Sequence, residues 1–191
     1  MFQHFINDLI GRRAPSSERE DAARRLIETC GYAAAAATLL PIPGTELIAV
    51  MPIHVGMVVG LSQLYDAELS EDSAAELVLQ IGATVGASLF TSKMTTTAAK
   101  IILPGLGGFI GAPLIFATTV AIGAVASAFF DRGGEVSPEE MRRIYRSAMR
   151  GARRDFDPTR ARSTEAKDMA EKAAADTPPP VSYTHLRAHE T

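Results

Sequence analysis

The stretch that decides the fold is "LPGLGGFIGAPLIFATTVAIGAVASAFF", residues 103–130, which carries no charged side chain. From Phe109 to Phe130 it predicts a helix of about 22 residues, roughly 33 Å long, enough to cross about 30 Å of hydrocarbon. A helix that is apolar on all sides must be enclosed by protein or by lipid. Its polar side chains are limited to Thr118, Thr119 and Ser127.

The neighbouring segments bear on which environment encloses this helix. Residues 47–64 are also uncharged but contain Pro52 and His54, and Lys93 and Lys100 bracket the polar run that precedes the apolar stretch. We expect the helix to contact lipid, because a complete protein jacket is hard to build from short, kinked or interrupted neighbours. The alternative is that the helix forms the core of a soluble helical bundle.

Composition limits the size of the fold and the classes of partner that we expect. The chain has 191 residues, of which 47% are hydrophobic and 21% charged, enough for one domain with a sizeable core. The net charge of −3 provides no overall attraction to nucleic acid, so no nucleic-acid partner is expected. Cys30, the single cysteine, is expected to be a small buried apolar residue rather than a nucleophile.

Helix signals outnumber strand signals and predict an all-α fold: a helical bundle with Gly/Ala-rich apolar central helices and polar terminal segments. "SPEEMRR" combines a Ser137 cap, Pro138 at the first helical position and Glu140 three residues after the cap. The predicted organisation has four segments. They are N-terminal amphipathic and polar helices (1–30), an apolar helical domain (31–134), a basic amphipathic helix (135–156) and a disordered tail (157–191). The tail is expected to begin with a frayed helix.

Both termini carry features of their own. Phe2, Phe5, Ile6, Leu9 and Ile10 fall on one face of a helix, which is expected to cover an edge of the core, with a membrane surface as the alternative. Residues 181–191, "VSYTHLRAHET", resemble a translated sequencing adaptor, so we assign them no function. We expect no packed contacts from residues 178–191.

Three central segments repeat a G-x-x-x-G spacing. Glycines four residues apart share one helix face and let another backbone approach closely, in lipid or in water. Each costs roughly 1 kcal/mol of helix propensity against alanine, which close packing is expected to recover. The predicted packing residues are Gly56, Gly60, Gly82, Gly86, Gly107 and Gly111.

A basic amphipathic helix follows the apolar stretch. One face of "MRRIYRSAMRGARR" is expected to carry Met141, Ile144, Tyr145, Ala148, Met149 and Ala152. The arginines cover the rest and are candidates for contact with lipid headgroups or with an acidic partner. The alternative is a solvated face paired with Glu18, Glu20 or Asp21. The candidate residues are Arg142, Arg143, Arg146, Arg150, Arg153 and Arg154.

No residue pattern indicates an enzyme. His54 stands among apolar residues without a metal-ligand spacing and is expected to be a hydrogen-bonded core histidine. "PGLGGFIG" lacks the Lys-Ser/Thr of a phosphate-binding loop. We therefore expect no catalytic residue, no cofactor and no metal site.

The segment from about residue 31 to 134 resembles a known bacterial family. "LLPIPGTELIAVMPIHVGMVVGLSQLYDAELSED" and the opening stretch show its proline pair, its Leu-Tyr before an acidic capped helix, and its proline-glycine break. This pattern resembles the YcjF-type domain of unknown function, often associated with GTP-binding domains. The resemblance implies association with the inner membrane for some members, and it supplies no catalytic residues.

These observations predict a membrane-associated helical protein with a structural or regulatory role, serving a GTPase in trans. Membrane lipid, a GTP-binding protein and a second copy of the chain are the candidate partners, and the cytoplasmic membrane is the expected location. The alternative is a soluble helical protein-interaction module in the cytoplasm.

Overall fold

The computed structural model describes residues 16–40, 45–90 and 107–176, and every regular element in these ranges is helical. The predicted all-α fold is therefore confirmed. A short 3-10 turn, Arg160–Arg162, precedes the last helix. The helices are α2 (Ser16–Ala37), α3 (Thr45–Leu64), α4 (Glu71–Phe90), α6 (Gly107–Asp131), α7 (Pro138–Asp155) and α8 (Thr164–Ala175).

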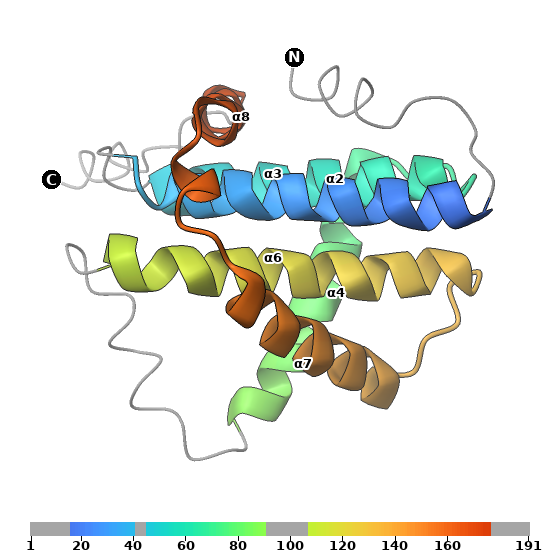
Figure 1. Ribbon diagram of the computed structural model, residues 1–191. Helices are drawn as coiled ribbons and strands as arrows, with labels where there is room; N and C mark the ends of the chain where they lie inside the picture. Colours follow the sequence, from blue (N-terminus) through green and yellow to red (C-terminus); the bar gives the residue numbers. More distant parts are fainter. Residues whose placement is uncertain (1–15, 41–44, 91–106, 177–191) are drawn as a thin grey trace, which may run out of the picture.

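The helices pack around α6 in layers (Figure 1). Helices α2 and α3 lie side by side above α6, and α2 runs antiparallel to it. Helix α7 crosses the other side of α6 obliquely, and α4 contacts α3, α6 and α7. Helix α8 lies across α2 and α3, on the side away from α6.

Small residues let α2 pack closely in this arrangement. Residues Ala33 to Ala37 are all fully buried, because the short side chains keep both faces of the helix near its neighbours. At Gly31 an added Cβ would lie 3.0 Å from the ring of Phe116. At Gly123 it would lie 2.7 Å from Cγ1 of Ile27. These two glycines, one on each helix, therefore set the spacing of the α2–α6 crossing.

The protein cover of the apolar helix is incomplete. Helices α2, α3, α4 and α7 pack around it, and no residue from Gly111 to Phe130 is in the exposed class. However, only 44% of its most apolar window is buried, and the remaining side chains are partly exposed. The segment Gly111–Asp131, with a mean hydropathy of 1.9, is long and apolar enough to cross a membrane. A buried core helix meets the same criterion.

The turn between α6 and α7 fixes the angle at which α7 crosses. Gly133 and Gly134 have φ values of 61° and 93°, a region that side chains disfavour. Their N–H groups donate to the carbonyls of Phe130 and Phe129, over 3.1 and 2.8 Å, and so end α6. The chain then reverses and α7 returns along α6.

Residues 164–175, predicted as a frayed helix within a disordered tail, form the regular helix α8. Helix α8 begins at a cap in which the Ser163 side chain accepts a hydrogen bond from the N–H of Ala166. It packs against α2 and α3. Residues 177–191, including the adaptor-like stretch, lie outside the described residues. The buried side chains of α8 are Ala166, Met169, Ala170 and Ala173.

Candidate functional site

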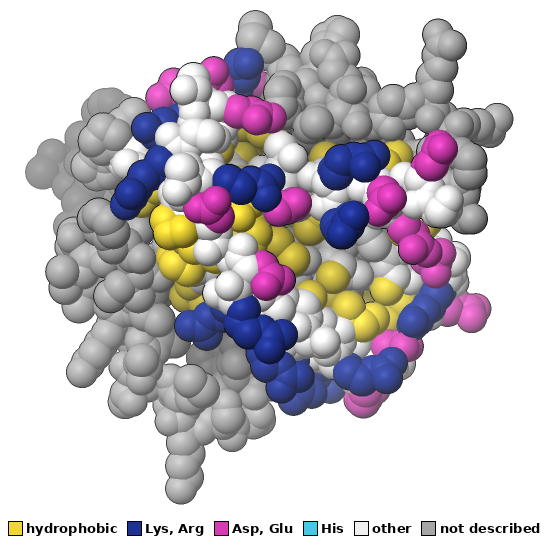
Figure 2. All heavy atoms as spheres, in the orientation of Figure 1, with side chains coloured by type: hydrophobic (Ala, Val, Ile, Leu, Met, Phe, Trp, Pro, Cys, Tyr) yellow, Lys and Arg dark blue, Asp and Glu magenta, His cyan; other side chains and the backbone are white. Residues whose placement is uncertain are grey.

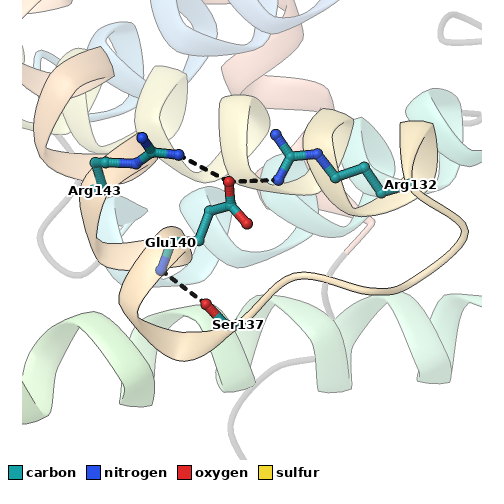
Figure 3. Close-up of polar contacts among 4 residues, drawn as sticks. All are labelled: Arg132, Ser137, Glu140 and Arg143. Carbon is teal, nitrogen blue, oxygen red and sulfur yellow. Dashed lines mark hydrogen bonds and ion pairs between the residues drawn. The ribbon is translucent and has the colours of Figure 1, made fainter.

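The N-terminal turn of α7 is held by the residues that the sequence singled out. The Ser137 hydroxyl accepts a hydrogen bond from the N–H of Glu140 at 3.3 Å, and Pro138 begins the helix, as predicted. The Glu140 carboxylate contacts Arg132 at 2.7 Å and Arg143 at 2.8 Å (Figure 3). Hydrogen bonding to Arg132 is the largest cause that lowers the pKa of Glu140. This junction anchors α7 to the end of α6.

The apolar face of α7 lies against α6, and this orients the arginines. Met141, Tyr145 and Ala152 are buried. Ile144, Ala148 and Met149 are partly buried against the same core. The predicted apolar face of this helix is therefore confirmed, and the arginines of α7 occupy the remaining surface (Figure 2).

The first three arginines of α7 have local partners. Arg142 is half-buried, and its Nε donates to the carbonyl of Thr84 in α4 at 3.1 Å. Its guanidinium also lies 3.4 Å from Glu139. Arg143 pairs with Glu140, and the Nε of Arg146 donates to the carbonyl of Arg142 at 3.1 Å. Part of this group therefore holds α7 in place.

The last three arginines form a free basic cluster, defined as Arg150, Arg153 and Arg154. All three are exposed, and within the described ranges none forms an ion pair. The alternative pairing with Glu18, Glu20 or Asp21 does not occur among the described residues, where Asp21 pairs with Arg24 of its own helix. The free basic cluster is thus available to an external anion.

The predicted glycine crossings differ from those observed. Gly82 is exposed, and an added Cβ there would meet none of the described residues within 4 Å, so no close crossing is seen at Gly82 in the described ranges. Gly111 is buried, but its added Cβ also meets none of the described residues within that distance. Gly56 and Gly60 are buried, whereas the surroundings of Gly86 and Gly107 lie outside the described side chains.

Sequence reasoning missed Gly31 and Gly123, which make the close contacts of the α2–α6 crossing. Neither belongs to a G-x-x-x-G pair. Their partners, Phe116 and Ile27, are distant in sequence, so no local pattern marks these two glycines.

The core contains one polar pair. His54 is 6% exposed, and its Nε2 lies 2.9 Å from the Thr119 hydroxyl. That hydroxyl donates to the carbonyl of Ile115, so its oxygen accepts the Nε2 proton of His54. Burial lowers the pKa of His54 to about 4. The prediction of a hydrogen-bonded core histidine is confirmed.

Cys30 is also in the core. It is fully buried, and burial raises the pKa of its thiol to about 12. The expectation of a small buried apolar residue is confirmed. Within the described residues, no three His, Cys, Asp or Glu side chains gather closely enough to hold a metal ion.

A groove of about 520 Å³ lies between α2, α6 and α7. Its apolar walls come largely from small side chains, and acidic groups stand along its edges. In Figure 2, hydrophobic side chains show between the charged side chains of α2 and those of α7. The lining residues used below are Glu20, Ile27, Phe116, Ala124, Ala148 and Asp155.

Comparison with known proteins identifies relatives of this chain. It is 29% identical over 176 residues to "Magnetosome membrane protein 22" of Magnetospirillum gryphiswaldense, covering 87% of this chain and 85% of that protein. No solved structure matches it. Residues 9–152 match the profile of a family described as "Domain of unknown function (DUF697)". Since this match covers more than half of the sequence, the chain belongs to that family.

Proposed function

We propose that this is a membrane-associated helical protein whose helix α7 rests its free basic cluster on an anionic lipid surface. The observation that carries the proposal is the exposure of Arg150, Arg153 and Arg154 without carboxylate partners in the described ranges. A guanidinium presents several donors that match phosphate oxygens. Each basic residue near an anionic leaflet contributes about 1 kcal/mol.

The similarity to "Magnetosome membrane protein 22" supports a location at a membrane. That protein is named a membrane protein, and it aligns with most of this chain. In this proposal the covered helix α6 is the core that positions α7, and lipid contact is made at the headgroups. We place the protein at the cytoplasmic membrane, where anionic headgroups face the cytoplasm.

The role that we propose is structural or regulatory, in trans with a GTP-binding protein. The resemblance to YcjF-type domains supports such a partner. GTP hydrolysis by candidate GTPases of the same organism, measured with and without this chain, tests that part. If the rate of GTP hydrolysis is unchanged and no GTPase binds this chain, the proposed GTP-binding partner is wrong.

Vesicle sedimentation tests the lipid contact. The purified full chain is mixed with vesicles of phosphatidylcholine alone or with added phosphatidylglycerol. We expect binding only to the anionic vesicles, and weaker binding at high salt because exposed charges are screened. In Arg153→Gln/Arg154→Gln the loss of about 2 kcal/mol corresponds to roughly 30-fold weaker partitioning.

The matched control changes two exposed cations elsewhere. Arg25→Gln/Lys167→Gln removes the same charge from α2 and α8, where both side chains are exposed. This control should retain most of the binding. Equal loss in both variants would show that net charge alone attracts the chain, and would contradict a site on α7.

A second candidate function is a helical protein-interaction module without membrane insertion. The packing of α2, α3, α4 and α7 around α6 favours it, because residues 111–130 are all buried or only partly exposed. In that case the free basic cluster would meet an acidic protein surface. Absence of binding to any vesicle, with the protein folded, would favour this candidate.

A further inference from the structure

The groove between α2, α6 and α7 runs along a partly exposed face of α6. Val120, Ala124 and Ser127 line it, and they share this face because they are spaced four and three residues apart. All three are half-buried, and they belong to the segment with a mean hydropathy of 1.9. The groove volume of about 520 Å³ lies in the range of small-molecule sites, roughly 300–1,000 Å³. The groove therefore offers an apolar ligand a place against the core helix.

Two of the charged side chains that line the groove are not neutralised by the protein. Glu28 pairs with Arg160, and Arg24 pairs with a carboxylate of its own helix. Glu20 and Asp155 are exposed, and within the described ranges neither forms an ion pair. One carboxylate on α2 and one on α7 are therefore available to an external cation.

Helix α7 places members of the free basic cluster next to one of these carboxylates. Gly151 and Asp155 line the groove, while Arg150 and Arg154 directly precede them in the sequence and are exposed. Figure 2 shows basic side chains bordering the hydrophobic strip between α2 and α7. The last turns of α7 therefore present apolar groove wall, a carboxylate and two guanidinium groups close together.

We propose that the groove binds one acyl chain of an aminophospholipid, with the lipid phosphate at Arg150 and Arg154 and the lipid ammonium group at Asp155. This inference rests on the proposed lipid contact of α7 and names the class of lipid. A guanidinium matches phosphate oxygens, and a carboxylate accepts charge-assisted hydrogen bonds from a primary ammonium. A purely anionic lipid has no group for the carboxylate, and a cationic amphiphile has none for the arginines.

The ends of the groove give the bound chain its direction. Asp155 directly precedes Phe156, whose ring centroid lies 5.4 Å from that of Phe116 on α6. Asp155 and the lipid headgroup therefore lie at the Phe116 end. Ser127, on the same helix, is about 16 Å further along α6 at 1.5 Å per residue. The acyl chain would follow α6 from Phe116 toward Ser127 and cover its half-buried face.

Binding of monomeric lysolipids to the full chain tests the proposal without a bilayer. The probes are lauroyl lysophosphatidylethanolamine and lauroyl lysophosphatidylcholine, below their micelle concentrations, and titration calorimetry measures their affinities. Both carry the same acyl chain and phosphate, but the choline nitrogen has no N–H to donate. We expect the ethanolamine lipid to bind about 5-fold more tightly, which corresponds to about 1 kcal/mol for one exposed charged contact. Equal affinities would overturn the proposal.

Asp155→Asn should remove this preference, and Asp168→Asn is the matched control. Asp168 is exposed on α8 and within the described ranges forms no ion pair, so its substitution changes the net charge equally. A carboxylate in the last turn of a helix opposes the helix dipole, so Asp155→Asn should not destabilise α7. Arg150→Gln/Arg154→Gln should weaken both lysolipids alike. A preference that persists in Asp155→Asn would contradict the headgroup assignment.

Gly151→Leu tests the acyl site. An added Cβ at Gly151 would meet none of the described residues within 4 Å, so the leucine can enter the groove while the fold is kept. We expect this variant to lose binding of both lysolipids but to keep sedimentation with phosphatidylglycerol vesicles, because the free basic cluster is intact. Unchanged lysolipid binding in Gly151→Leu, or spermidine binding as tight as that of the lysolipid, would overturn the acyl site alone. Loss of vesicle binding by the unmodified chain would instead overturn the proposed function.

Discussion

Ile27 of α2 lies against Gly123 of α6 so closely that no β carbon fits between them. An added Cβ at Gly123 would be 2.7 Å from Cγ1 and 2.9 Å from Cγ2 of Ile27. Ile27 is β-branched, so its χ1 has little freedom to move aside within a helix. This contact fixes the distance between the core helix and the helix that supplies much of its cover.

Gly123→Ala should therefore lower the free energy of unfolding, measured by chemical denaturation. Gly82→Ala is the matched control, because it gains the same helix propensity at an exposed position with none of the described residues within 4 Å. We expect Gly123→Ala to be less stable than Gly82→Ala by about 1–3 kcal/mol, the usual cost of overpacking. Equal stability would show that the crossing adjusts freely.

The burial of His54 predicts a stability that falls in acid. The pKa of His54 is about 4 when folded and about 6.5 when unfolded, so the unfolded chain binds the proton more readily. The neutral His54 therefore contributes up to about 3 kcal/mol to the free energy of unfolding. This contribution is complete above about pH 6.5 and is lost as the pH falls toward 4.

His54→Gln should remove that component, since glutamine can donate to the Thr119 oxygen but does not titrate. The measurement is the free energy of unfolding of both proteins between pH 7 and pH 4. The free energy of unfolding of the unmodified protein, minus that of His54→Gln, should fall as the pH falls from 6.5 toward 4. Parallel pH profiles would contradict the assignment to His54.

Met169 anchors α8 to α2 and α3, with 1% of its surface exposed. Met169→Ala should cost about 2–5 kcal/mol, because it leaves a cavity beneath the helix. Glu171→Ala, on the exposed side of α8, is the control and should change stability by less than about 0.5 kcal/mol. Thermal unfolding of the two variants checks this, and similar midpoints would mean that α8 is not part of the cooperative fold.

Local signals predicted the helices and the apolar face of α7. The Ser137 cap and this apolar face depend on residues within a few positions of one another. The hydrogen bond of His54, in contrast, joins it to Thr119, 65 positions away. The start of α4 is also a local feature. The Ser70 hydroxyl caps this helix by accepting a hydrogen bond from the N–H of Ser73 at 3.2 Å. The acidic pair Glu71 and Asp72 fits the first turn that results.

The helix crossings were not predictable from spacing. G-x-x-x-G repeats mark shared faces, but Gly82 faces outward, while the crossing depends on Gly31 and Gly123. Which glycine meets another helix is decided by tertiary packing between distant segments.

Helix α8 was predicted only as a frayed helix, for a different reason. Its alanine-, lysine- and glutamate-rich composition, followed by prolines, is typical of a tail. The signal for a packed helix is the spacing of its buried residues, at positions i, i+3, i+4 and i+7 on one helical face. Those residues are Ala166, Met169, Ala170 and Ala173.

Membrane fractionation of the untagged protein, with successive washes of the pellet, tests most directly whether α7 holds the protein at a lipid surface. We expect the protein to sediment with membranes and to be released by high salt or carbonate without detergent, because the contact is electrostatic and α6 stays packed among the other helices. Two results would contradict it. Release only by detergent would place α6 in the lipid, and recovery in the soluble fraction before any wash would leave the protein without a membrane surface.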